Sequence, residues 1–339
     1  MSASPPRKFD LNFLARTDSL FSDFAPYVPS INDLGTVAFQ ASLAGKKSNA
    51  FTKGGGEGVA QYHCDPSIVR AVCSHPDINS QGDLVLYVEL KTGEYAVMLI
   101  QSGRTEMLAS APEQFRSIGP LGPTMNDRAA VAFRAESLSG LEGIYLAEKG
   151  GVRIVTSGGG IFRKFQGLPV VNREGDVVFR ADLNNGGQGV YKDCGGTIQQ
   201  IIETGDEFVE LGLFPTINNR DQVAFVAKLR DGTQGVFVAT QGKSNKVMDS
   251  ADGFESFRGA LINDQGLVVF YATPTGGKLG IFSGEKGNVT EITGIGRPFA
   301  GSTVSGFALN PVSVNEAGQF VFRVTLVDGG QFIVRADPA

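Results

Sequence analysis

The side chains best suited to chemistry recur at two matched positions of a repeated segment. The first position follows directly after a phenylalanine or leucine, and in five copies it holds an arginine or a tyrosine: Tyr87, Arg134, Arg180, Tyr271 and Arg323. The second position lies two residues later and holds a carboxylate in three copies: Glu89, Glu136 and Asp182. Arginine binds acids and stabilises a leaving group, whereas a tyrosine or a carboxylate can act as a base. Together these residues could form a site for an acidic ligand or substrate.

These positions belong to a unit that is copied seven times along the chain. Its most regular mark is an asparagine, found at Asn32, Asn79, Asn126, Asn172, Asn218, Asn263 and Asn315. The successive spacings are 47, 47, 46, 46, 45 and 52 residues, and a fixed period of this length is typical of a propeller or a solenoid. A glycine follows three residues after most of these asparagines. We therefore expect the asparagines to form tight turns rather than to bind a ligand.

Each unit is predicted to form four short antiparallel strands. In the fifth copy, runs rich in valine, isoleucine and phenylalanine cover residues 214–217, 222–229, 235–238 and 245–248, and turn-forming residues separate them. A proline stands three residues before the asparagine in five copies: Pro29, Pro76, Pro123, Pro169 and Pro215. Proline cannot donate to a strand ladder and is tolerated at a sheet edge. The first strand of each unit is therefore predicted to be the innermost strand, beside a central channel.

The two ends of the chain predict how the ring closes. The seventh copy ends after its third strand, at residues 331–335, and lacks a fourth. The N-terminal segment 12–21 resembles the fourth strand and following loop of the fourth copy, residues 201–208. We predict one all-β domain over residues 1–339, a seven-bladed β-propeller whose last blade is completed by an N-terminal strand at about residues 10–17. Such closure leaves only short, protected strand edges.

Blade packing gives the matched arginines and carboxylates a second interpretation. Side chains two residues apart on a strand share one face, and that face would pack against the next blade. A buried charge needs a partner, so Arg134 with Glu136, and Arg180 with Asp182, could be ion pairs that only join blades. The alternative is a polar wall around the channel mouth, on the face opposite the asparagine turns.

Cys73, His75 and Asp77 form a weaker candidate site in the second copy. A cysteine beside a histidine is an arrangement that can produce a nucleophile. His63 and Cys64 lie nearby in sequence, but a strand of seven residues would separate them from Cys73 and His75 by roughly 20 Å. Zinc requires all its ligands within about 2.3 Å of the metal. We therefore predict no metal site and no cofactor.

The turn motif carries a resemblance to a known group of proteins. The pattern Asn-x-x-Gly-x-x-x-Phe is intact at residues 32–39, 172–179, 263–270 and 315–322. It resembles the tandem repeat of bacterial proteins described by this same pattern, and the resemblance covers nearly the whole chain. Ala129 and Asp221 replace the glycine in two copies, and Leu86 replaces the phenylalanine in another. The resemblance implies a propeller and no common activity.

Composition limits the class of partner. Lys and Arg total 30 against 35 Asp and Glu, a net charge of −5, which argues against nucleic acid. The sequence contains no apolar segment of the kind that forms a signal peptide or spans a membrane. Three cysteines cannot form a disulfide framework. We expect a cytoplasmic protein, with a monomer as the default state.

Two functions remain open at this point. In the first, the propeller binds a small molecule, a peptide or a protein at the channel mouth opposite the asparagine turns. In the second, the same mouth is the active site of a metal-independent enzyme of small-molecule metabolism, with arginine, tyrosine and carboxylate side chains as its machinery. A fold alone does not decide between them.

Overall fold

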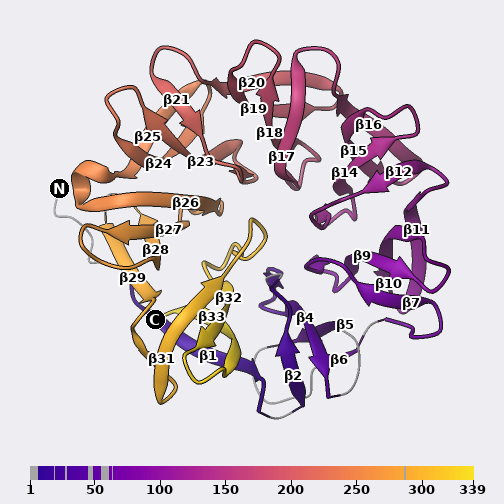
Figure 1. The fold of residues 1–339 in the computed structure, drawn as a ribbon, viewed down its shortest axis with the longest axis horizontal. Helices are drawn as coiled ribbons and strands as arrows, with labels where there is room; N and C mark the ends of the chain where they lie inside the picture. Colours follow the sequence, from indigo (N-terminus) through magenta and orange to yellow (C-terminus); the bar gives the residue numbers. More distant parts are fainter. Residues whose placement is uncertain are drawn as a thin grey trace.

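The computed structural model describes residues 7–18, 20–26, 29–44, 49–54, 61–62, 64–285 and 288–339. These residues form seven β-sheets of four or five strands each, which follow one another around a central channel (Figure 1). The seven-bladed β-propeller predicted from the repeat is therefore confirmed. No helix in the described part of the chain is long and apolar enough to cross a membrane.

The first four blades have the following strands. Blade 1 contains β2 (Phe21–Phe24), β3 (Ser30–Ile31), β4 (Val37–Leu43), β5 (Asn49–Lys53) and β6 (Gln61–Tyr62). Blade 2 contains β7 (Val69–Val72), β8 (Asp77–Ile78), β9 (Leu84–Leu90), β10 (Tyr95–Gln101) and β11 (Arg104–Ala111). Blade 3 contains β12 (Phe115–Ile118), β13 (Thr124–Met125), β14 (Val131–Ser137), β15 (Glu142–Glu148) and β16 (Gly151–Ser157). Blade 4 contains β17 (Phe162–Val171), β18 (Val177–Leu183), β19 (Gln188–Cys194) and β20 (Thr197–Glu203).

The last three blades differ slightly in their strands. Blade 5 contains β21 (Phe208–Leu211), β22 (Thr216–Ile217), β23 (Gln222–Leu229), β24 (Gln234–Thr240) and β25 (Lys243–Asp249). The single 3-10 turn η1 (Ser250–Asp252) leads into blade 6, which contains β26 (Phe254–Ile262), β27 (Val268–Pro274), β28 (Gly280–Glu285) and β29 (Asn288–Gly294). Blade 7 contains β30 (Pro298–Phe299), β31 (Ser302–Ala308), β32 (Phe320–Leu326), β33 (Gln331–Pro338) and the N-terminal strand β1 (Phe9–Arg16).

The N-terminal strand closes the ring, as predicted. Strand β1 pairs antiparallel with β33, from Phe9 opposite Pro338 to Arg16 opposite Phe332. In Figure 1 the indigo start of the chain lies against the yellow C-terminal strands. Joining the first and last segments of the chain in one sheet leaves no gap between blades 7 and 1.

Phenylalanine rings fill the space within and between blades. Phe225 of β23 stacks on Phe237 of β24 with ring centroids 5.8 Å apart. Both lie in one apolar cluster with Val178 and Val190 of blade 4. The repeat phenylalanine is buried in every copy that has one: Phe39, Phe133, Phe179, Phe225, Phe270 and Phe322. The hydrophobic core is thus a series of layers between neighbouring sheets.

The innermost strand of most blades is broken in two near the repeat proline. In blade 1, β2 and β3 both pair with β4, and Pro29 lies just before β3. The same division separates β7 from β8, β12 from β13 and β21 from β22. In blade 4 the strand β17 continues, but its register shifts between Gln166 and Val170. The residues in these breaks leave the ladder beside the channel.

The repeat asparagines join neighbouring blades in addition to forming turns. Asn263 accepts hydrogen bonds from the backbone N–H groups of Gln265 (3.1 Å) and Leu267 (3.0 Å), which closes its own turn. Its side-chain Nδ2 donates to the backbone carbonyl of Asn315 in the next blade (3.0 Å). The same link to the next asparagine is made by Asn32, Asn126, Asn172, Asn218 and Asn315. The turn role was expected, whereas the link between blades was not.

The link can be tested by comparing Asn263→Ala with Asn79→Ala. Asn79 also closes its turn, but its Nδ2 donates to Asp83 of its own blade (3.0 Å). We expect Asn263→Ala to lower the free energy of unfolding by about 2–4 kcal/mol, because buried backbone groups in two blades lose their partners. Asn79→Ala should lower the free energy of unfolding by a smaller amount, about 1 kcal/mol in total. Chemical denaturation measures both, and equal losses would contradict the role of the link.

A second prediction concerns the two copies that lack the turn glycine. Ala129 and Asp221 adopt the same left-handed backbone as the glycines, with φ of 58° and 59° against 92° at Gly175. A side chain strains this conformation. We expect Ala129→Gly to stabilise the protein by about 1 kcal/mol, and Gly175→Ala to destabilise it by about the same amount. If thermal melts show Ala129→Gly to be destabilising, backbone strain is not what distinguishes these turns.

Candidate functional site

Four of the five matched arginines and tyrosines reach across to the next blade. The hydroxyl of Tyr87 donates to the carbonyl of Ile118 (2.7 Å), and Nη1 of Arg134 donates to the carbonyl of Gly167 (2.7 Å). The hydroxyl of Tyr271 donates to the carbonyl of Leu309 (3.0 Å), and Nη1 of Arg323 donates to that of Ala25 (2.8 Å). These carbonyls lie at or next to the broken inner strands. The side chains therefore supply hydrogen bonds that the interrupted ladders lack.

The carboxylates of the second matched position are also occupied. Asp182 pairs with Arg180, as the sequence suggested. Arg134, however, pairs with Glu142 of β15, and Glu136 pairs with Arg116 (3.1 Å) instead. The expected Arg134–Glu136 pair is therefore wrong, because Glu142 lies opposite Glu136 on the neighbouring strand and Arg134 turns toward it.

Glu89 has a partner as well. Its carboxylate pairs with Arg70 (2.7 Å), whose side chain is half exposed at the surface of blade 2. The eight matched side chains are thus distributed over several blades: Tyr87, Arg134, Tyr271 and Arg323 bond to the next blade, whereas Glu89, Glu136, Arg180 and Asp182 form ion pairs within their own blades. Of these eight residues, only Tyr271 also lines a cavity in the central channel, which is described below.

The weaker trio of Cys73, His75 and Asp77 does not form a nucleophile. The sulfur of Cys73 contacts the carbonyl of Ala71 (3.9 Å), and Nδ1 of His75 faces the hydroxyl of Ser74 (3.4 Å). Burial, together with the charge of Glu89, raises the pKa of Cys73 to about 11, so the reactive thiolate is disfavoured.

The sequence analysis argued against a zinc site formed by His63, Cys64, Cys73 and His75. His63 lies outside the described residues. Cys64 is buried in the core, and burial raises the pKa of its thiol to about 11. Among the residues that the structure describes, no three His, Cys, Asp or Glu side chains are placed to hold a metal ion together.

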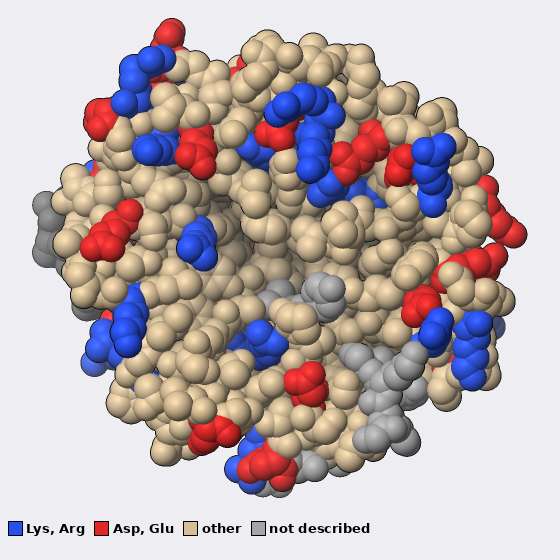
Figure 2. All heavy atoms as spheres, viewed as in Figure 1, with Lys and Arg blue, Asp and Glu red and all other residues tan. Residues whose placement is uncertain are grey.

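A largely apolar cavity of about 370 Å³ lies in the channel, on the face opposite the asparagine turns. We call it the channel-mouth cavity. Each blade contributes at least one residue from its inner strand or from the break in that strand: Pro26, His75, Leu121, Leu168, Phe214, Leu261 and Leu309. Leu279 and Phe307 extend it between blades 6 and 7, beside Tyr271. Figure 2 shows this face, and the surface around the central hollow consists mostly of uncharged residues.

Two polar side chains border the channel-mouth cavity, one of them buried and the other exposed. His75 is buried, with 3% of its surface exposed, and its Nε2 has no hydrogen-bond partner among the described residues. Burial lowers the pKa of His75 to about 4, an effect that the Pro123 carbonyl partly offsets, so the ring is neutral. Arg258 lies beside the bulge at Gly259 in β26, where the register with β27 shifts. Its exposed guanidinium is the one charged group lining the described cavity.

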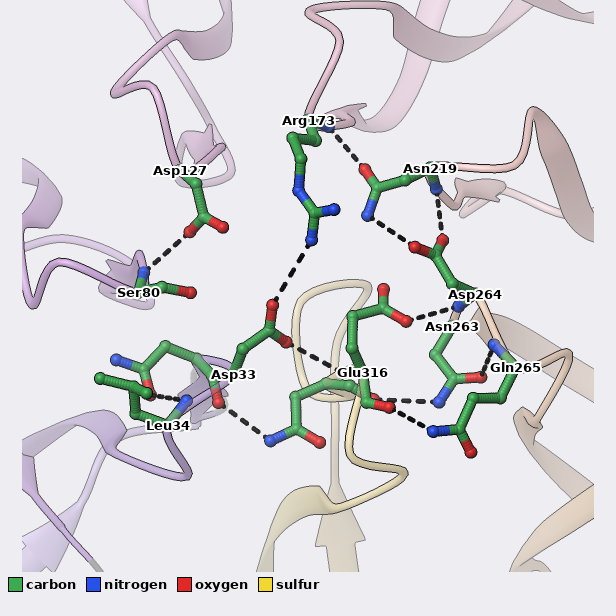
Figure 3. A network of polar contacts seen from close by, with 12 residues as sticks. Asp33, Leu34, Ser80, Asp127, Arg173, Asn219, Asn263, Asp264, Gln265 and Glu316 are labelled. Atoms are coloured by element: carbon green, nitrogen blue, oxygen red, sulfur yellow. Dashed lines mark hydrogen bonds and ion pairs between the residues drawn. The ribbon is translucent and has the colours of Figure 1, made fainter.

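The opposite mouth of the channel is polar instead of apolar. The residues that follow the repeat asparagines meet there, and five of them accept a hydrogen bond from the backbone of the neighbouring turn, as Asp264 does from the N–H of Asn219 (2.6 Å). Arg173 reaches across the channel to Asp33 (3.8 Å). The blades run counter-clockwise in Figure 1 and clockwise in Figure 3, so the two figures view opposite faces and Figure 3 shows this acidic mouth.

One buried and one partly buried carboxyl group, Asp77 and Glu316, border the acidic mouth. Asp77 accepts from the N–H groups of Ile78 (2.8 Å) and Met125 (2.7 Å), yet burial raises its pKa to about 7, with the charge of Asp127 adding to the shift. Burial likewise raises the pKa of Glu316 to about 7, and the carboxylates of Asp264 and Asp33 act in the same direction. Both groups therefore hold a proton over part of the neutral range.

Of the residues of the channel-mouth cavity, the sequence analysis singled out only His75 and Tyr271, although a signal for the others exists. The position four residues before the repeat asparagine holds Leu168, Phe214 and Pro311 in three copies, and His75 in the second. A polar residue at an otherwise apolar position of a repeat marks a local departure. That signal becomes meaningful only once the broken strand places this position at the channel.

Comparison with known proteins supports the fold and leaves the activity open. A family model described as a family of unknown function, DUF7453, matches residues 67–212. No curated protein matches this chain.

Three solved structures of similar shape are distant in sequence. The β-propeller domain of the Trilobed protease from Pyrococcus furiosus is 10% identical, with a TM-score of 0.65 over 93% of this chain and 94% of that one. An oligogalacturonate lyase from Vibrio parahaemolyticus is 10% identical, with a TM-score of 0.62 over 97% of both chains. An oligogalacturonate lyase in complex with manganese is 11% identical, with a TM-score of 0.63 over 98% of this chain and 97% of that one. Likeness at this level of identity shows the propeller alone.

The raised carboxyl pKa values predict how stability depends on pH. The folded protein keeps protons on Asp77 and Glu316 up to about pH 7, whereas the unfolded chain releases them near the ordinary values of 3.8 and 4.5. Because the native state binds more protons in this window, the free energy of unfolding falls as pH rises from 5 through 7. Unfolding by urea at several pH values measures this slope.

Asp77→Thr isolates one of the two groups. Threonine occupies this position in blade 3, where the Thr124 hydroxyl donates to the carbonyl of Pro169 (2.9 Å). Relative to the wild type, the variant should gain on the order of 2 kcal/mol between pH 5 and pH 8, since it has no buried carboxyl to ionise. An effect of Asp77→Thr that is the same at both pH values would contradict the raised pKa.

Proposed function

We propose that this protein is a β-propeller that binds a small, largely apolar molecule in its channel-mouth cavity. The observation that carries the proposal is the cavity itself, a concave space of about 370 Å³ to which all seven blades contribute. Its size lies within the range of small-molecule sites, and its apolar walls with a few polar groups match their usual composition.

The energetics favour an apolar occupant. Leu121, Leu168, Phe214 and Phe307 border the cavity and would exchange contact with water for contact with the ligand. Burying apolar surface contributes about 25 cal/mol per Å². No aspartate or glutamate lines the described cavity, so nothing in it attracts a cation.

The engagement of the matched arginines and tyrosines supports binding over catalysis. A metal-independent enzyme of the kind considered from sequence would need one of these groups to reach a substrate. Arg134, Arg323 and Tyr87 instead donate to backbone carbonyls of the next blade. The carboxylates of that set are paired with arginines of their own blades. Binding of a peptide or a protein, a cytoplasmic location and a monomeric state remain predictions from the sequence.

The binding site can be tested with the fluorescent probe 8-anilinonaphthalene-1-sulfonate, which joins an apolar aromatic body to one sulfonate group and becomes bright in apolar surroundings. We expect saturable binding to the folded wild-type protein. Leu121→Trp should weaken it at least about tenfold, because the larger ring occupies the cavity. Leu34→Trp is the matched control, since Leu34 is 76% exposed on the opposite face, and should bind as the wild type does.

Thermal melts of both variants distinguish a blocked cavity from an unfolded protein. Equal affinity for the probe in Leu121→Trp and Leu34→Trp, with both proteins folded, would place the binding elsewhere. Failure of the wild type to bind the probe or any other small apolar molecule would reject the proposed function.

A further inference from the structure

Asp77 occupies a position at which other copies of the repeat hold a hydroxyl group that joins two blades. In four copies a serine or threonine hydroxyl at this position donates to a backbone carbonyl of the next blade: Ser30 to Pro76 (2.9 Å), Thr124 to Pro169 (2.9 Å), Thr216 to Ala260 (2.8 Å) and Ser313 to Pro29 (2.6 Å). A carboxylate only accepts hydrogen bonds. Asp77 accepts from the N–H of Ile78 in its own strand and from that of Met125 in blade 3. Of the seven copies, only the second places an ionisable group at this junction.

No cation compensates a negative charge on Asp77. Its side chain is 2% exposed, and the charged neighbour that acts on it is the carboxylate of Asp127 in blade 3, which repels a second negative charge. Arg173 reaches Asp33 across the acidic mouth (Figure 3), and Glu316 adds another carboxyl group there. A buried charge without a partner is costly. Close contact between blades 2 and 3 therefore favours the protonated, neutral form of Asp77.

The titratable groups nearest to Asp77 within blade 2 do not supply a positive charge either. Asp83, just before β9, is acidic and accepts from Asn79 (3.0 Å). Burial lowers the pKa of His75 to about 4 and raises that of Cys73 to about 11, so both are neutral between pH 6 and pH 8. The ionisation of Asp77 is thus opposed from its own blade as well as from blade 3.

The same contact between blades 2 and 3 forms part of the wall of the channel-mouth cavity. Ser74 and His75 line the cavity, and Asp77 follows on the same segment of chain at the acidic mouth. Gly122 of blade 3 lies so close that an added Cβ would stand 3.0 Å from the ring and from the carbonyl of His75. Its N–H donates to the hydroxyl of Ser74 (2.9 Å), and the preceding Leu121 lines the cavity. This wall depends on blades 2 and 3 remaining in contact.

We propose that, if the cavity binds a ligand as proposed above, a proton on Asp77 controls that binding. While the carboxyl group is protonated, blades 2 and 3 stay in contact, and His75 and Leu121 form the wall that holds the ligand. Ionisation puts an uncompensated charge into the contact, so water enters and the wall loosens. The ligand binds the protonated form, and by linkage ligand and proton favour the binding of one another.

The sign and size of the pH effect follow from this scheme. Because burial raises the pKa of Asp77 to about 7, the closed form loses its proton as pH rises through 7. If only the protonated form binds, the competent fraction falls from about 0.9 at pH 6 to about 0.1 at pH 8. The dissociation constant of the wild type should therefore be about tenfold larger at pH 8.

The experiment is a titration of 8-anilinonaphthalene-1-sulfonate into the wild type at pH 6 and pH 8, at one ionic strength. The sulfonate of the probe is ionised at both values, so its own charge does not change. Leu121→Trp, titrated in parallel, measures binding outside the cavity. Thermal melts at both pH values show whether each protein is folded.

Asp77→Thr and Asp77→Ser test the assignment of the proton. Both side chains occur at this position in other copies and neither ionises, so each variant should bind the probe equally at pH 6 and pH 8. Glu316→Gln is the matched control. It removes a carboxyl group of the same mouth whose pKa is also raised to about 7, but on blade 7, and should keep the tenfold difference.

The possible outcomes separate this inference from the proposed function. Saturable binding that is equally tight at pH 6 and pH 8 in the wild type would overturn the control by a proton and leave the binding site in place. A tenfold difference that persists in Asp77→Thr and Asp77→Ser, or disappears in Glu316→Gln, would overturn the role of Asp77. Absence of binding at both pH values would reject the proposed function, and the inference with it.

Discussion

The fold depends on a single asparagine side chain, used repeatedly. Its carbonyl oxygen accepts the N–H groups of its own turn, and its amide donates to the backbone of the next blade, as Asn263 does toward Asn315. Because the turn and the link share one rigid amide group, the geometry of each turn also sets the position of the neighbouring blade. The ring is closed at the chain ends by pairing of β1 with β33, so the chain of amide links continues from Asn315 to Asn32.

The broken inner strand provides the functional surface. Near the repeat proline the ladder is interrupted, and the carbonyls it leaves are bound by Tyr87, Arg134, Tyr271 and Arg323 from the preceding blades. The residues released from the ladder then line the channel and form the cavity. The arginines and tyrosines stabilise the site by binding the backbone carbonyls near the breaks. The apolar residues of the breaks form the walls of the cavity. The two mouths of the channel thus differ, one acidic and one apolar.

The repeat made the fold predictable from the sequence, whereas the cavity could be recognised only in the three-dimensional structure. Seven asparagines at regular spacing and the unmatched chain ends were sufficient to predict seven blades and the closing strand. The partner of Arg134 was not predictable, because Glu136 and Glu142 are both acidic and only the strand register selects Glu142. His75 was noticed beside Cys73, but its relevant neighbours are Ser74 and Gly122, and Gly122 lies on another blade. Contacts between blades depend on a register that the sequence of one copy does not specify.

The most direct test of the account is a crystal structure of the protein with decanoate that carries bromine at its far end. Anomalous scattering locates the bromine independently of how the rest of the ligand is interpreted. The account predicts a bromine peak inside the channel-mouth cavity. A peak at the acidic mouth, or in the groove beside Tyr87 and Tyr95 between blades 2 and 3, would contradict it.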